Sequence, residues 1–153
     1  MNARIFLAFD FGEKRIGVAV GNDLAESANA LTTLVASNDD DRFNAIGHLV
    51  KDWQPAVFVV GYPSHPDGTP HEMSVRAERF ARQLEGRFRT PVKLVDERYS
   101  SSEAELKLAR ERGRKPKDKL AIDAEAAATI LRRFFDSGAH KLPMVNTKAS
   151  VNS

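Results

Sequence analysis

The chain has 153 residues, a formal net charge of +2 and 42% hydrophobic residues, which suits one domain with a single sizeable core. It contains no cysteine, so disulfides, thiolate metal sites and cysteine nucleophiles are excluded. The sequence has no apolar signal segment and no run near the roughly 18 apolar residues that cross a bilayer, so we expect a cytoplasmic protein without membrane contact.

The first third of the chain predicts three strands and a helix. Ile5–Asp10 and Arg15–Val20 are apolar runs joined by a short turn that contains glycine. Leu31–Ala36 is a weaker strand candidate. The segment SNDDD then offers N-caps for a helix whose apolar residues recur at helical spacing up to Pro55.

The rest of the chain alternates strands with helices. Ala56–Gly61 is a continuous run rich in β-branched residues, typical of a strand buried on both faces. We then expect a helix with an apolar stripe over 77–88, a strand over 92–97, a helix over 102–113 and a last helix over 120–135. This order predicts a mixed α/β fold, with one domain over 1–137 and a flexible C-terminal tail over 138–153.

Two carboxylates stand at predicted strand ends. Asp10 is charged in an otherwise apolar strand, and burying it costs several kcal/mol unless the charge is compensated. An ion pair with Lys14 or Arg15 would be one explanation. Glu97 ends the strand that begins at Val92, and an ion pair with Arg98 would likewise account for it.

A third carboxylate lies on the last helix. Asp123 shares the apolar face with residues that follow it by three or four positions, near the first turn of that helix. Pairing with the helix N-terminus would explain Asp123 alone. Three carboxylates from two strand ends and one helix start can also converge, and converging carboxylates need a cation. Oxygen ligands favour Mg²⁺ or Mn²⁺, which favours phosphodiester chemistry.

The positive charge is concentrated in one segment. Arg110–Lys119, RERGRKPKDK, holds six basic and two acidic residues, a local charge of +4 that leaves about −2 for the rest. A focused basic patch indicates a polyanionic partner, although a solvated loop has the same composition.

Four segments together resemble one known family. In chain order, LAFDFGEKRIGVAV, VVGYPSHPDGT, LVDERYSSSEAE and IDAEAAATILRRFF are similar to the motifs of the YqgF (RuvX) family. These are small bacterial ribonuclease H-like proteins, described as Holliday junction resolvases and as nucleases that mature the 5′ end of pre-16S rRNA. The resemblance implies a ribonuclease H-like α/β fold: a five-stranded mixed sheet, with strands one to three antiparallel, flanked by helices.

The resemblance also implies roles for particular residues. It carries the family's acidic residues onto Asp10, Glu97 and Asp123, as catalytic residues and as ligands of Mg²⁺ or Mn²⁺, with two ions when substrate is bound. Lys14 and Arg15 match the KRIG of the family. The full set of candidate nucleic-acid contacts is Lys14, Arg15, Arg98, Arg114, Lys115 and Lys117.

The sequence leaves the roles of two features near these motifs undecided. Glu13 stands where the family usually has a small residue, and an acid there can repel a phosphate. His65 and His71 flank a loop, where they either contact phosphate or are simply solvated.

The leading functional interpretation is a metal-dependent nuclease that acts on RNA and processes the 5′ end of pre-16S rRNA. One alternative is a DNA junction resolvase, which would act as a dimer; monomer and dimer are both open. A second is a non-catalytic rRNA-binding assembly factor, which needs the basic loop but not three acids. An ATP-dependent phosphotransferase of related fold would need a second lobe that the chain lacks.

Overall fold

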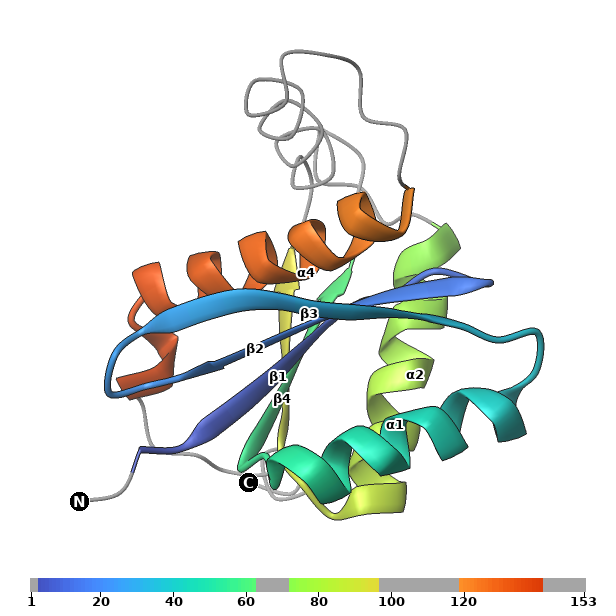
Figure 1. The fold of residues 1–153 in the computed structure, drawn as a ribbon, viewed down its shortest axis with the longest axis horizontal. Helices are drawn as coiled ribbons and strands as arrows, with labels where there is room; N and C mark the ends of the chain where they lie inside the picture. The colour runs from blue at the N-terminus through green and yellow to red at the C-terminus, as the bar shows by residue number, and fades with distance from the viewer. Residues whose placement is uncertain (1–2, 63–71, 97–118, 142–153) are drawn as a thin grey trace.

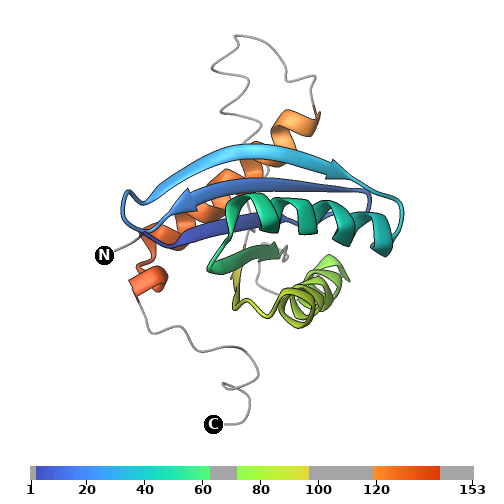
Figure 2. The same ribbon diagram turned by 60° about the horizontal axis from the view of Figure 1, so that its bottom comes forward.

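The computed structural model describes residues 3–62, 72–96 and 119–141. They form one sheet with helices on both faces (Figures 1 and 2). The elements are β1 (Ile5–Asp10), β2 (Arg15–Asn22), β3 (Ser27–Val35), α1 (Asp39–Trp53), β4 (Val57–Tyr62), α2 (Glu72–Phe88), β5 (Val92–Asp96), α4 (Lys119–Asp136) and the 3₁₀ helix η1 (Ala139–Lys141). The helix expected over 102–113 lies outside the described residues. No helix in the described ranges is long and apolar enough to cross a membrane.

The sheet has the predicted mixed topology. Its five strands lie in the order β3-β2-β1-β4-β5. β1 pairs antiparallel with β2, and β2 antiparallel with β3, whereas β4 is parallel to both β1 and β5. β1 is therefore central, and its last residue, Asp10, lies between buried residues of both neighbouring strands, Gly17 and Gly61.

Side-chain alternation divides the core between the two faces of the sheet. Leu7 and Phe9 of β1 pack with buried residues of α1 and α2, whereas Phe6 and Ala8 pack with buried residues of α4. Figure 1 shows α4 along one face and the other two helices on the opposite side. Successive side chains of a strand point to opposite faces, so Asp10 continues the series that faces α4.

Helix α1 begins and ends at local signals that the sequence contains. The side chain of Asn38 accepts a hydrogen bond from the Asp41 amide at 2.8 Å, an N-cap inside the predicted SNDDD segment. At the other end Gln54 is left-handed with φ of 51°, and its amide donates to the Val50 carbonyl at 2.8 Å. Pro55 follows and prevents continuation of the helix.

Strand β3 differs from the prediction. It begins at Ser27, four residues before the expected Leu31. The added residues, SANA, are small or polar and lack an apolar alternation that would mark a strand. Their extended form comes from pairing with β2, for example between Ala28 and Gly21, and a β-carbon on Gly21 would collide with the Ser27 carbonyl oxygen.

The ordered chain continues past the predicted domain end at 137. His140, in η1, is only 4% exposed, and its ring packs edge-on against Phe135 with centroids 5.0 Å apart. Its Nε2 lies 3.1 Å from Glu26 Oε2, and its carbonyl accepts a hydrogen bond from Arg4 at 2.7 Å. These contacts attach residues 138–141 to the fold, and the domain boundary at 137 with a flexible tail beyond it stays a prediction. Residues 142–153 lie outside the described part.

Arg4 also fixes the start of the sheet through Asp23. Its amide donates to Asp23 Oδ1 at 2.8 Å, and its Nε donates to Oδ2 at 2.7 Å. Burial raises the pKa of Asp23, but the hydrogen bonds and the charge of Arg4 outweigh burial and hold the pKa below its ordinary value of 3.8.

This pair predicts a pH-dependent contribution to stability. A carboxyl whose pKa is lowered on folding stabilises the fold above its unfolded pKa, and the contribution is lost as pH falls through the lowered value. We expect Asp23→Asn to cost up to about 1 kcal/mol at pH 7 because the pair is partly solvated, and to cost nothing once the pH lies below the lowered pKa. Urea unfolding of both proteins from pH 7 down to pH 2.5 checks this, with exposed Asp52→Asn as the control. An equal cost at every pH would contradict it.

Candidate active site

Asp10 ends the central strand beside two glycines. Its Cα partner on β2 is Gly17, and its Cα partner on β4 is Gly61. Cross-strand partners share a face of the sheet, and glycine places no side chain there. The strands on both sides of Asp10 therefore leave the α4 face clear around its half-buried carboxylate.

Helix α4 rests directly on one of these glycines. A β-carbon on Gly17 would collide with the carbonyl oxygen of Asp123 and would lie only 2.9 Å from the amide nitrogen of Ala124. A glycine inside a strand often marks such a close backbone approach. Gly17 thus has Asp10 beside it in the sheet and the backbone of Asp123 against its face. Two acids far apart in the sequence are brought to the same glycine.

A neighbouring contact fixes the first turn of the helix. Thr33 of β3 is the Cα partner of Gly17, so Asp10, Gly17 and Thr33 form one row across three strands. The Thr33 hydroxyl donates to the carbonyl of Leu120 at 2.5 Å. The start of α4 therefore crosses this row and contacts it at two residues, Gly17 and Thr33. Thr33 is a positioning residue that the sequence did not single out, because a lone Thr in a strand carries no periodic signal.

Asp123 contacts a cation from the sheet. Its Oδ2 lies 3.0 Å from Nε of Arg15, and the side chain is 21% exposed. The first turn of α4 contains no acidic residue, since the helix already runs from Lys119. The helix dipole acts mainly within the first turn, so an interaction with the helix N-terminus is a poor explanation for an acidic residue at position 123. Arg15, a predicted nucleic-acid contact, forms an ion pair with Asp123 in this structure.

The structure describes only part of the predicted site. Lys14 is exposed in the turn between β1 and β2. The other predicted contacts and ligands lie outside the described residues: Glu97, Arg98, Arg114, Lys115, Lys117, His65 and His71. Among the side chains that are described, no group of three or more potential metal ligands occurs. Asp10 and Asp123 are therefore two members of the predicted set of three.

Glu13 is turned to a different partner. Its carboxylate pairs with Arg76 of α2, and its carbonyl accepts a hydrogen bond from Arg42 of α1 at 2.6 Å. Both helices lie on the side of the sheet opposite α4. The negative charge that departs from the family pattern is thus offset by a cation on that side.

The described acids fit a divalent cation. Carboxylate oxygens are the donors that Mg²⁺ and Mn²⁺ take, and the residues directly opposite Asp10 on the neighbouring strands are both glycines. The guanidinium of Arg15 against Asp123 shows that this corner already accommodates positive charge. Asp10 and Asp123 would hold the ion, together with a further oxygen ligand from outside the described ranges.

Comparisons with known proteins show which family this chain is similar to. The family model RuvX, described as Holliday junction resolvase, matches residues 4–137. A protein of Burkholderia vietnamiensis named "Putative pre-16S rRNA nuclease" is 56% identical over 133 residues, covering 86% of this chain and 88% of its own. A Burkholderia cenocepacia protein of the same name is 55% identical over 132 residues, covering 85% and 87%.

A solved structure shares the fold at low identity. Thermus thermophilus RuvC in complex with a Holliday junction substrate superposes with a TM-score of 0.52 at 16% identity, covering 92% of this chain and 99% of that one. This likeness confirms the ribonuclease H-like architecture. With the family match over almost the whole described fold, the chain belongs to the RuvX family of nucleases.

Proposed function

We propose that this chain is a metal-dependent nuclease that hydrolyses phosphodiester bonds at the 5′ end of precursor 16S rRNA. The observation that carries the proposal is the placement of Asp10 and Asp123 around Gly17, on one face and at one end of the sheet. The names of relatives with more than half of the aligned residues identical favour the rRNA precursor as substrate.

Each acid has a defined part in the proposed site. Asp10 presents its carboxylate from a rigid central strand, and Asp123 from a helix anchored on Gly17 and Thr33. We expect Glu97 to be the third ligand: it comes two residues after Val95, which packs with the α4 cluster, and side chains two apart in a strand share a face. When bound, divalent ions activate the attacking water and stabilise the leaving oxygen.

Arg15 has a supporting part in the same proposal. Its side chain is 40% exposed and reaches Asp123 from the start of β2. The guanidinium can therefore hold Asp123 in position and also contact a phosphate of a bound strand, since Arg has several donors.

Two alternatives are distinguished by substrate and by activity. The family description favours a resolvase of branched DNA. The second alternative is a non-catalytic rRNA-binding factor, whose RNA binding would not require the two acids placed around Gly17. Purified protein with Mg²⁺ or Mn²⁺ is incubated in parallel with labelled pre-16S rRNA, single-stranded DNA and a four-way DNA junction. We expect cleavage of the RNA; cleavage of the junction alone would favour the resolvase, and RNA binding without any cleavage the assembly factor.

The basic loop predicts how affinity depends on salt. Arg114, Lys115 and Lys117 shortly precede the helix that carries Asp123. Phosphate contacts give a log–log salt slope of roughly −0.7 each for single strands, so the triple Ala variant should flatten the slope by up to about 2. Cleavage at saturating RNA should change much less, because the acids stay in place.

The matched control removes the same charge elsewhere. Lys51, Arg82 and Lys141 are exposed, and their triple Ala variant should leave the slope near that of the wild type. Binding is measured at several salt concentrations beside single-turnover cleavage. Equal slopes for the two triple variants would mean that RNA does not contact the loop.

A further inference from the structure

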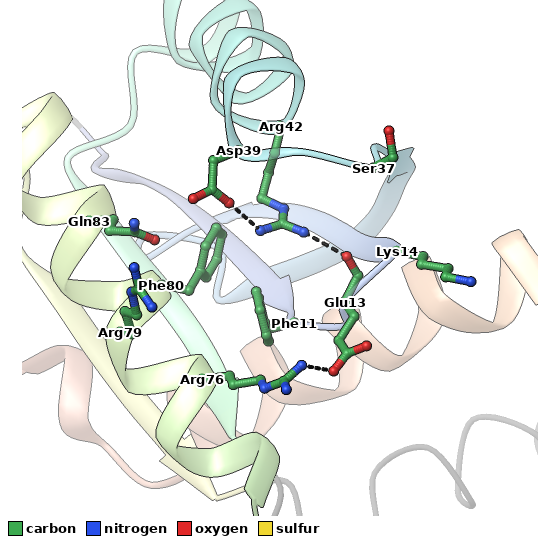
Figure 3. A pocket seen from close by; sticks show the side chains of 10 residues that line it. All are labelled: Phe11, Glu13, Lys14, Ser37, Asp39, Arg42, Arg76, Arg79, Phe80 and Gln83. Atoms are coloured by element: carbon green, nitrogen blue, oxygen red, sulfur yellow. Dashed lines mark hydrogen bonds and ion pairs between the residues drawn. The ribbon is translucent and has the colours of Figure 1, made fainter.

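A second hollow lies on the other side of the turn that follows Asp10. A pocket of about 480 Å³ is enclosed by this turn, α1 and α2 (Figure 3). Its apolar floor includes Phe11 and Phe80, whose ring centroids are 4.9 Å apart. Phe11 directly follows Asp10, and it packs with the core on the α1 and α2 side. We call this hollow the turn pocket.

The turn pocket carries an excess of positive charge. Its cationic residues are Lys14, Arg42, Arg76 and Arg79, and its acidic residues are Glu13 and Asp39, a net charge of +2. Pockets of this volume are large enough for a nucleotide-sized ligand. A cationic rim around an apolar floor matches a nucleotide, which has an anionic phosphate and an apolar base.

Two of the four cations are engaged by the protein. The side chain of Arg42 is 11% exposed. Its Nη1 donates to Asp39 Oδ1 at 2.9 Å, and its Nη2 donates to the Glu13 carbonyl at 2.6 Å. Its guanidinium also stands 5.5 Å from the Phe11 ring centre. Arg76 pairs with Glu13. These contacts hold the wall of the pocket in shape.

The other two cations are available to a ligand. The side chains of Lys14 and Arg79 have no ion pair or hydrogen bond to another residue within the described ranges. Both are exposed, and Figure 3 shows them on opposite sides of the pocket, with Arg79 coming from α2 and Lys14 pointing outward from the turn. Because no acid in the described part of the chain neutralises these two cations, we infer that an anionic ligand does so.

We propose that the turn pocket binds one nucleotide of the same nucleic-acid strand that is cut at Asp10 and Asp123, with its phosphate at Arg79. This inference rests on the proposed function. The two sites are on opposite faces of one strand end, and only the short turn from Phe11 to Lys14 separates them. A strand that passes over this turn meets the acids on one side and the turn pocket on the other.

The test compares two arginines of α2. Arg79 lines the turn pocket, whereas Arg82 is exposed on the same helix and does not line it. Dissociation constants are measured for single-stranded RNAs lengthened one nucleotide at a time, at low salt and with a chelator so that no RNA is cleaved. We expect Arg79→Ala to weaken binding about tenfold, but only beyond a threshold length, and to flatten the salt slope by about 0.7. Arg79→Lys should restore most of the affinity, and Arg82→Ala should change it less than about twofold.

Other results would overturn the inference. Equal effects of Arg79→Ala and Arg82→Ala at every length would show that the strand does not enter the turn pocket. If uridine 5′-monophosphate binds as tightly as long RNA and its binding depends equally on Arg79, the turn pocket is a site for free nucleotides and not for a strand. Cleavage by Asp10→Asn at the wild-type rate would reject the proposed function but would leave the binding result as it stands.

Discussion

Replacing Asp10 with Asn is expected to abolish RNA cleavage without destabilising the metal-free protein. The variant keeps the shape of the side chain and removes one of the charges placed around Gly17. Loss of a residue that merely supports a metal ligand costs 10- to 100-fold, so loss of a ligand should lower the cleavage rate by at least about 100-fold. Carboxylates that share a site repel one another without a cation, so stability should be unchanged or slightly higher.

Two measurements on the same preparations separate activity from stability. Single-turnover cleavage gives the rate, and urea unfolding without metal gives the free energy of unfolding. Asp52→Asn, an exposed carboxylate on α1, is the matched control and should match the wild type in both. An Asp10→Asn protein that unfolds would identify Asp10 as a structural ion-pair partner. One that cleaves normally would remove it from the active site.

Gly17→Ala is expected to have the largest effect on stability. Its methyl group would collide with the Asp123 carbonyl and crowd the Ala124 amide, and both are backbone atoms that cannot turn aside as a side chain can. Helix α4 must then move off the sheet, which loosens its packing against residues such as Ala19 and Phe6. Overpacking of this kind costs about 3 kcal/mol or more. Urea unfolding measures the loss.

Gly86→Ala is the matched control for this substitution. Gly86 lies in α2 with nothing within 4 Å of an added β-carbon, so Ala there should stabilise the protein by up to about 1 kcal/mol. Gly17→Ala should also lower the cleavage rate under conditions where it is still folded. A shift of about 1 Å in the position of a reacting group can cost 100-fold. A Gly17→Ala protein as stable as the wild type would contradict the close backbone contact between α4 and Gly17 of β2.

The elements that the sequence predicts well are those with a local signal. The apolar runs of β1 and β4, the N-cap of α1 and the helical spacing of α4 all appear where expected. The position of Asp123 on the apolar face of its helix was also predictable, because periodicity of 3.6 residues alone decides it.

What could not be predicted depends on contacts between distant segments. The first residues of β3 become extended through pairing with β2, and His140 is buried by Phe135 and held by Glu26. Neither fact leaves a pattern in the sequence. The same holds for Arg15: the residues suggested a pair with Asp10, whereas the ion pair of Arg15 with Asp123 depends on the contact of α4 with Gly17.

The turn pocket is a further consequence of packing. Lys14 and Arg79 come from a turn and a helix that the sequence treats as unrelated, and they share a cavity because α2 packs against the central strands. Sequence reasoning could identify Glu13 as unusual, but its partner Arg76 follows only from the orientation of α2.

The most direct test of the account is single-turnover cleavage of a labelled RNA that spans the 5′ end of pre-16S rRNA, as a function of Mg²⁺ or Mn²⁺. Wild type, Asp10→Asn and Asp123→Asn are measured side by side. We expect the wild type to cleave only with a divalent metal, to lose activity in a chelator and to regain it with excess metal, while neither variant cleaves measurably. Cleavage by the wild type in a chelator, or by either variant at the wild-type rate, would contradict a metal-dependent site built on these two acids.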